Sequence, residues 1–252
     1  MSRSGKDADR RVKTGRGRTA SSVRWLERQL NDPYVKQARA AGYRSRAAFK
    51  LAELDERFGL LKGVKRVVDL GIAPGGWSQV VRQRAPKAAV VGIDLLETEP
   101  LEGVTILQLD FVADAAPAAL EAALASQSNG GPPDLVLSDM AANTVGHKQT
   151  DHLRTMGLVE AAAHFAVEVL AEGGAFVSKV LAGGTDAELL ALLKRHFRTV
   201  KHAKPPASRK GSSEWYVVAQ GFKGPSRRSD CVLAPQEERQ SEQPPPRSSR
   251  AG

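Results

Sequence analysis

The sequence predicts an α/β domain built on a doubly wound, mostly parallel sheet. Two observations carry this prediction: short β-rich runs alternate with helical patterns along most of the chain, and four of these runs end in an aspartate. Strands separated by helices are typical of parallel sheets that carry helices on both faces. At 252 residues, 41% of them hydrophobic, the chain is long enough for one substantial core, and its length requires no second domain.

The elements follow one another in a regular order. Apolar, β-branched runs with the length of buried strands occur at 64–71 (VKRVVDLG), 88–95 (AAVVGIDL), 104–111 (VTILQLDF), 133–140 (PDLVLSDM), 173–181 (GGAFVSKVL), 197–204 (FRTVKHAK) and 214–222 (EWYVVAQGF). Longer stretches with helical spacing, several rich in Ala and Leu, separate them at 47–58, from Gly76 onward, at 115–125, at 152–170 and at 186–196. This alternation predicts a single folded domain over 21–223.

The two ends of the chain differ from the middle in composition. Residues 1–20 are rich in Arg, Gly and Ser, and residues 224–252 are rich in Pro, Ser and Arg. Neither segment can bury enough apolar surface to fold alone, so we expect two disordered tails.

The net charge of +9 suggests a polyanionic partner, although +5 of it lies in residues 1–20 and +1 in residues 224–252. Two inner segments are also basic: 24–50 has seven basic residues against two acidic ones, and 194–210 has seven Lys/Arg and no acid. Contact with nucleic-acid phosphates and a solvated basic surface are both compatible with such segments.

Other features of composition exclude several classes of protein. A single cysteine, Cys231, excludes a disulfide framework and favours a reducing, cytoplasmic setting. The polar N-terminus resembles no signal peptide, and the most hydrophobic helical stretch is interrupted by His164 and Glu168, so no secretion or membrane span is expected. The five histidines lack a metal-ligand pattern such as HExxH, so no metal site is expected.

Four aspartates close successive apolar runs: Asp69, Asp94, Asp110 and Asp139. Ligands of doubly wound sheets bind beyond the carboxyl ends of the strands, so these carboxylates should line one edge. For any one of them alone, an ordinary strand-end or cap residue is the alternative.

A glycine-rich turn, DLGIAPGGWSQ (69–79), links the first of these strands to its helix. Glycine lets the backbone bend tightly and approach a ligand closely. The turn is neither GxGxxG nor a Walker sequence, which disfavours nicotinamide and nucleoside triphosphate cofactors. Asp94 is placed to accept hydrogen bonds from the ribose of a nucleoside ligand, and Asp110 from an adenine amino group.

The turn, the SDMA segment (138–141), RSRAAFKL (44–51) and FVSKV (176–180) together resemble the FtsJ/RrmJ-type methyltransferases over about 22–222. The resemblance implies a Rossmann-like methyltransferase fold with an antiparallel strand near the C-terminus. It also implies S-adenosylmethionine as cofactor and, as substrate, the 2′-hydroxyl of a uridine in the A-loop of 23S ribosomal RNA, within the large ribosomal subunit. The cofactor contacts that it implies are Asp69, Gly71, Gly75, Trp77, Asp94, Asp110 and Asp139, with packing on the sheet as the alternative for Trp77. The sequence departs from the family at Ile72, where many relatives have alanine, and at Ala142, where proline commonly follows SDMA.

The same resemblance implies a catalytic tetrad of Lys50, Asp139, Lys179 and Glu214. Lys179 lies in an apolar strand, where burial and a second cation such as Lys50 would favour an uncharged amine that can accept a proton. We therefore expect Lys179 to act as base or polarising group for the ribose hydroxyl, with Asp139 holding it in line. Lys50 would orient the hydroxyl or counter its charge, and Glu214 would position the nucleotide or a lysine. Asp139 is the alternative base.

Aromatic residues make up only 5% of the chain, so recognition of RNA is expected to rest on phosphates and shape more than on base stacking. The candidate contacts are basic residues of the two inner segments: Arg24, Arg28, Arg44, Arg46, Lys201, Lys204, Arg209 and Lys210. Ribose methylation of transfer RNA and a catalytically silent assembly factor are the alternatives. We expect a monomer.

Overall fold

The computed structural model describes residues 20–127, 130–142, 146–182, 187–209 and 211–224. The predicted tails, apart from residues 20 and 224, lie outside these residues, as do Lys210 and Cys231.

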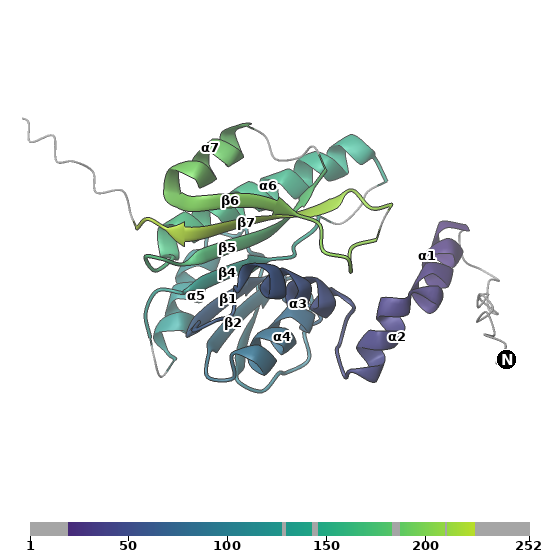
Figure 1. Ribbon diagram of the computed structural model, residues 1–252, viewed down its shortest axis with the longest axis horizontal. Helices are drawn as coiled ribbons and strands as arrows, with labels where there is room; N and C mark the ends of the chain where they lie inside the picture. Colours follow the sequence, from purple (N-terminus) through teal and green to yellow (C-terminus); the bar gives the residue numbers. More distant parts are fainter. Residues whose placement is uncertain (1–19, 128–129, 143–145, 183–186, 210, 225–252) are drawn as a thin grey trace, which may run out of the picture.

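One sheet runs through the described part of the chain, with its strands in the order β3-β2-β1-β4-β5-β7-β6 (Figure 1). Its members are β1 (Arg66–Leu70), β2 (Ala89–Asp94), β3 (Val104–Gln108), β4 (Leu135–Ser138), β5 (Ala175–Leu181), β6 (Phe197–Ala203) and β7 (Glu214–Phe222). The first five pair in parallel, whereas β7 is antiparallel to both β5 and β6. The α/β class, the parallel sheet and the reversed strand near the C-terminus are therefore confirmed.

Helices cover both faces of the sheet because the central strands are apolar on both sides. Successive residues of β1 show this, since Val67 packs toward α3 (Ala47–Phe58) and α4 (Gly76–Arg84), and Val68 toward the opposite core. Alternate side chains of a strand point to opposite faces, so a run of valines supplies two cores at once.

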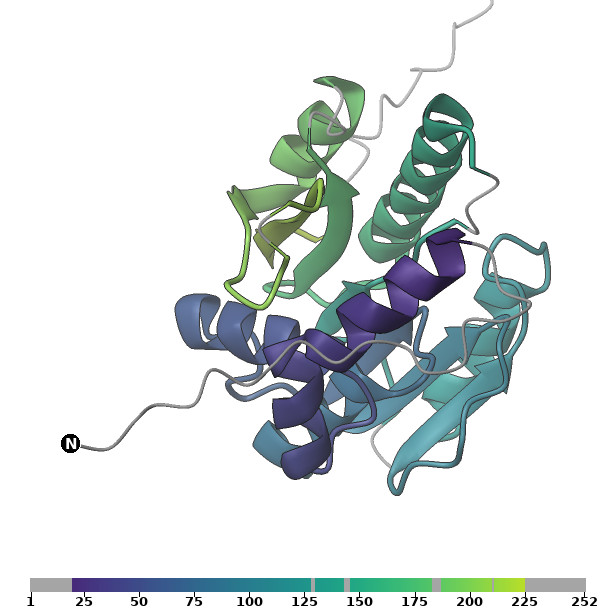
Figure 2. The ribbon, with the colours of Figure 1, turned by 90° about the vertical axis from the view of Figure 1, so that its right-hand side faces the viewer.

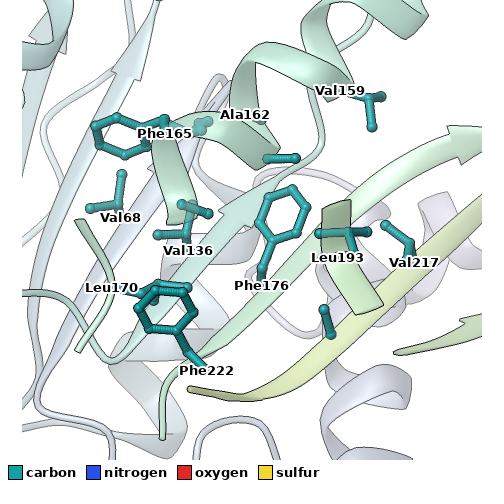
Figure 3. Close-up of a cluster of buried hydrophobic side chains, with 14 of the residues drawn as sticks. Val68, Val136, Val159, Ala162, Phe165, Leu170, Phe176, Leu193, Val217 and Phe222 are labelled. Atoms are coloured by element: carbon teal, nitrogen blue, oxygen red, sulfur yellow. The ribbon is translucent and has the colours of Figure 1, made fainter. Parts of the chain in front are cut away.

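The second core lies between the sheet and three helices: α5 (Ala116–Ala125), α6 (Lys148–Val169) and α7 (Ala187–His196). Figure 3 shows part of it, with Val136 and Phe176 from neighbouring strands beside Ala162 and Phe165 of α6. The full burial of these strand side chains fixes the register of the sheet, because a shift by one residue would exchange the two faces.

Two helices that were not predicted precede α3 in the chain: α1 (Ala20–Asn31) and α2 (Pro33–Ala40). They lie apart from the sheet (Figure 1) and cross in front of the edge at which the parallel strands end (Figure 2). A local signal for α2 is present in the sequence. Asp32 caps it by accepting from the Tyr34 amide at 3.0 Å, and Pro33 stands at the first helical position, where proline is favoured.

Within the described residues, no helix has the length and apolar character needed to cross a membrane. In the same part of the chain, no group of three or more His, Cys, Asp or Glu side chains is arranged to hold a metal ion.

Candidate active site

Four side chains from widely separated segments meet at the carboxyl edge of β4 and β5. Asp139 follows the last residue of β4, whose Ser138 pairs with Ser178 of β5. Lys179 comes next in β5 and pairs with Tyr216 of β7, two residues beyond Glu214. Lys50 reaches this point from the buried face of α3. The neighbouring positions of β4, β5 and β7 thus bring three of the residues together, and α3 adds the fourth.

The distances make one connected ionic cluster, which we call the tetrad (Lys50, Asp139, Lys179 and Glu214). Lys179 Nζ lies 3.2 Å from Asp139 Oδ1 and 2.5 Å from the Asp139 carbonyl oxygen. Lys50 Nζ lies 2.7 Å from Glu214 Oε1 and 3.9 Å from Asp139 Oδ2. Both lysine side chains are 11% exposed, so they are largely shielded and still reachable from solvent.

Tyr216 is a member of this site that the sequence analysis missed. Its hydroxyl lies 2.9 Å from Asp139 Oδ1 and 3.2 Å from Glu214 Oε1, and the Lys50 ammonium stands 5.8 Å from the ring centre. The signal was its spacing, because residues i and i+2 of a strand share a face and Tyr216 follows Glu214 at that interval. The phenol bridges the two acids of the tetrad.

The charges in the tetrad determine how its carboxylate behaves. Burial alone raises the pKa of Asp139, but the ammonium groups of Lys179 and Lys50, together with the hydrogen bond from Tyr216, hold that pKa below its ordinary value. Burial, followed by the charges of Asp139 and Glu214, raises the pKa of Tyr216 well above its ordinary value. At neutral pH the site therefore contains an ionised Asp139 and a phenol that keeps its proton.

The glycine-rich turn lies beside the tetrad, between β1 and α4. Gly71 has φ 79°, and a Cβ there would stand 2.7 Å from Met140 Cγ, directly after Asp139. Gly75 has φ 105° and precedes the first residue of α4. Both positions combine positive φ with close neighbours, which explains why the turn needs glycine.

Asp69 lies underneath this turn and is only 1% exposed. Its Oδ2 accepts a hydrogen bond from Ser78 Oγ at 2.6 Å, which ties β1 to α4. Burial is the main cause that raises the pKa of Asp69 to about 7, and the nearby charges of Asp139 and Asp94 act in the same direction. Asp69 thus lies within electrostatic reach of both Asp139 and Asp94.

Asp94 and Asp110 stand at the same edge, at the ends of β2 and β3. Asp94 accepts from the Ala73 amide of the turn and from the Leu96 amide, both at 2.9 Å, and Asp110 accepts from the Val112 amide at 3.1 Å. The neighbouring side chains Leu95, Leu96 and Val112 are exposed by more than half, which is unusual for large apolar residues. A partly buried carboxylate beside exposed apolar groups suits a nucleoside, with hydroxyls to donate and a flat ring to cover the apolar groups.

The structure places Trp77 in the core. Its ring is 3% exposed, its Nε1 donates to the Ala47 carbonyl at 2.9 Å, and it packs on Tyr216 with 5.7 Å between ring centres. The indole therefore joins α4 to α3 and backs the tetrad. These surroundings match the alternative given for Trp77 in the sequence analysis, namely packing on the sheet.

Several basic residues predicted as phosphate contacts are engaged within the protein. Arg44 donates to the carbonyls of Pro74, Glu99 and Pro100, and Lys204 donates to the Ser212 carbonyl at 2.7 Å. Arg46 and Arg209 both pair with Asp32. In the structure these side chains hold loops in place, and their contact with RNA phosphates stays a prediction. Lys201 is exposed on the edge strand β6, and the side chains of Arg24 and Arg28 lie outside the described residues.

Comparison with known proteins places this arrangement among methyltransferases. The family model described as FtsJ-like methyltransferase matches residues 43–222. A protein of Erythrobacter litoralis named ribosomal RNA large subunit methyltransferase E is 80% identical over 224 residues, which cover 89% of this chain and all of that protein. The protein of the same name from Novosphingobium aromaticivorans is 76% identical, over 89% of this chain and 99% of its own.

Among solved structures, a ribosomal RNA methyltransferase from Plasmodium falciparum is similar with a TM-score of 0.63 and 32% identity. The match covers 72% of this chain and all of that one. The family match over residues 43–222 spans the sheet, the glycine-rich turn and the tetrad alike.

Proposed function

Because the chain belongs to the FtsJ-like methyltransferase family, we propose that it transfers a methyl group from S-adenosylmethionine to the 2′-hydroxyl of a uridine in the A-loop of 23S ribosomal RNA. The enzyme class is that of its relatives, ribosomal RNA large subunit methyltransferases. The observation that carries the chemical part of the proposal is the tetrad, in which two lysines and two carboxylates are joined by contacts of 2.7–3.9 Å.

The fit of the cofactor can be judged from the residues at the carboxyl edge. Asp94, half-buried beside exposed Leu95 and Leu96, suits a ribose and an adjoining purine, and Asp110 with Val112 extends the same surface. The turn from Gly71 to Gly75 brings backbone close to this place, and Asp139 would border it from the other side. We assign Asp69 and Trp77 to the wall that supports the turn, since their side chains are buried. When bound there, S-adenosylmethionine supplies an electrophilic methyl group on a sulfonium.

Methyl transfer to a hydroxyl requires alignment of oxygen, methyl and sulfur. Positioning of this kind is worth on the order of 7–11 kcal/mol, whereas help from a general base contributes roughly 10²–10⁴-fold. We therefore assign most of the acceleration to placement of the ribose against the edge formed by Asp94, Asp139 and the glycine-rich turn.

The proton of the hydroxyl passes to Lys179 as the oxygen–methyl bond forms and the sulfur–methyl bond breaks. In its uncharged form the amine can accept this proton, and the resulting ammonium would lie 3.2 Å from Asp139 Oδ1, where its charge is stabilised. Asp139, whose Oδ1 lies 3.2 Å from the same amine, is the alternative base.

Lys50 and Glu214 form the second pair of the tetrad. Lys50 Nζ, fixed at 2.7 Å from Glu214 Oε1, places a positive charge 3.9 Å from Asp139. We assign to it the stabilisation of negative charge that develops on the attacking oxygen. Glu214 holds Lys50 in this position.

The alternatives are less well supported. A catalytically silent assembly factor would have no need of a buried lysine pair, which is costly to desolvate. Transfer RNA as substrate has no support among the relatives described above, which are named for large-subunit ribosomal RNA. We place the enzyme in the cytoplasm, acting as a monomer on the large subunit.

The proposal is tested by mapping the product. The protein is incubated with radiolabelled S-adenosylmethionine and, in parallel, with free 23S ribosomal RNA, purified large subunits or transfer RNA. We expect label in 23S ribosomal RNA, on one uridine, as a 2′-O-methyl group that makes the adjoining phosphodiester resistant to alkali. Label on a base, or in transfer RNA alone, would overturn the proposal.

A further inference from the structure

A second ionic cluster lies beside the tetrad and is not explained by the reaction. Asp32, which is 8% exposed at the start of α2, pairs with Arg46 at the start of α3. It also pairs with Arg209, whose Nη2 and Nε lie 3.1 and 3.2 Å from Asp32 Oδ2. We call these three residues the Asp32 cluster. One carboxylate thus joins three segments that are far apart in the sequence.

The cluster holds the connection between β6 and β7 against α3. The Ala207 carbonyl accepts a hydrogen bond from Arg46, and the Ala207 amide donates to Glu53 Oε2 at 2.7 Å. The other oxygen of Glu53 accepts from the hydroxyl of Tyr34 in α2 at 3.3 Å. Both backbone polar groups of Ala207 are therefore fixed by α3, and α2 supports the side chains that fix them.

The next residue, Ser208, links this connection to the tetrad. Its amide donates to the Pro205 carbonyl at 2.8 Å, and it is only 4% exposed. Its hydroxyl donates to Glu214 Oε1 at 3.0 Å, the same oxygen that accepts from Lys50 at 2.7 Å. Polar contacts thus connect Asp32 to Ala207, and the adjoining Ser208 connects the same loop to the lysine–glutamate pair.

We propose that Ser208 is a positioning residue for Glu214 and Lys50, and that the Asp32 cluster sets the position of Ser208. This inference rests on the proposed function, since it concerns how the tetrad is held. A carboxylate with a third donor has fewer rotamers available, and Lys50 is then confined as well. Removal of the Asp32 charge would leave Arg46 and Arg209 close together without their shared anion, and their repulsion would displace the connection that carries Ser208.

The experiment measures kcat and KM on large subunits at saturating cofactor, with cofactor affinity and thermal melting recorded for each variant. Ser208→Ala should lower kcat about tenfold, the effect of one lost hydrogen bond to a charged group, and leave cofactor affinity unchanged. Ser208→Thr keeps the hydroxyl and should retain kcat within about threefold of that of the wild type. Ser212→Ala is the matched control, because Ser212 lies in the same connection and its hydroxyl donates to the Arg209 carbonyl at 2.9 Å.

Coupling to the Asp32 cluster is tested by a double-mutant cycle. Asp32→Asn, which keeps an oxygen to cap α2, should also lower kcat about tenfold, and the double variant with Ser208→Ala should be no slower than the slower single variant. If Asp32→Asn does not fold, Arg209→Gln replaces it, because that side chain is 38% exposed and its change is better tolerated.

Two results would overturn the inference while the proposed function stands. The first is an active wild type together with a Ser208→Ala variant of equal kcat. The second is that the effects of Ser208→Ala and Asp32→Asn on kcat multiply independently in the double variant. A wild type that methylates none of the RNA substrates overturns the proposed function itself, and this inference with it.

Discussion

Replacement of Lys179 by methionine tests the assignment of the proton acceptor. Methionine has a similar length and no titratable group, so it preserves packing in β5 while it removes the amine. In the structure this change leaves Asp139 paired with Lys50 at 3.9 Å and hydrogen-bonded to Tyr216 at 2.9 Å, so the carboxylate stays in place. The loss of the base should then dominate the effect, at roughly 10²–10⁴-fold in kcat, which corresponds to about 3–5 kcal/mol.

The assay is single-turnover methylation of large subunits, with cofactor affinity measured by calorimetry on the same samples. Affinity should change little, because the carboxylates assigned to the cofactor are Asp94 at the end of β2 and Asp110 after β3, and they are held by the amides of Ala73 and Val112. Lys87→Met is the matched control, since Lys87 is exposed at the opposite end of β2. A Lys179→Met enzyme with kcat within about fivefold of that of the wild type would refute the reasoning, because even modest base catalysis exceeds that factor.

Three further predictions concern the cofactor site, a buried acid and the RNA. Asp94→Ala should weaken cofactor binding roughly 10–100-fold in calorimetry, as expected for lost hydrogen bonds to a carboxylate. Asp114→Ala, at an exposed position, is the control and should leave the affinity unchanged. Equal affinities of the two variants would contradict the assignment of Asp94. Asp69 has its folded-state pKa raised to about 7 from 3.8, so the unfolded chain releases this proton first and the wild type loses stability as pH rises from about 4 to 7. Between pH 5 and pH 8, the free energy of unfolding measured in urea should fall by up to about 2–3 kcal/mol less for Asp69→Asn than for the wild type. The same pH dependence for both proteins would show that burial does not hold this proton. Binding of the large subunit should weaken steeply as salt rises, because phosphate contacts release counterions; a flat response would count against recognition through basic residues.

Much of the site was predictable because the carboxyl ends of parallel strands lie at one edge of the sheet. Asp69, Asp94, Asp110 and Asp139 were read from that rule, and the structure places all four at the ends of β1, β2, β3 and β4. Their different surroundings were not predictable. Asp69 is buried under the turn and Asp94 is only half-buried, and this difference depends on the packing of Ser78 and the turn, which a pattern of apolar runs does not contain.

Contacts between distant loops account for most of what the sequence analysis missed. Arg46 and Arg209 were predicted as phosphate contacts from charge alone, and the structure pairs both with Asp32, in a segment that was not predicted to begin a helix. Ile72, a departure from the family, fits because Gly92 leaves room for it: a Cβ at Gly92 would stand 2.3 Å from Ile72 Cδ1. Such pairs follow from tertiary packing, and one sequence gives no local signal for them.

A crystal structure with S-adenosylhomocysteine tests the central claim most directly, since it locates the sulfur relative to the tetrad. With the methyl group and the ribose oxygen between them, sulfur and Lys179 Nζ should lie roughly 7 Å apart or less, with the ribose hydroxyls of the ligand on Asp94. A ligand bound at this edge with its sulfur directed away from Lys50 and Lys179 would contradict the account.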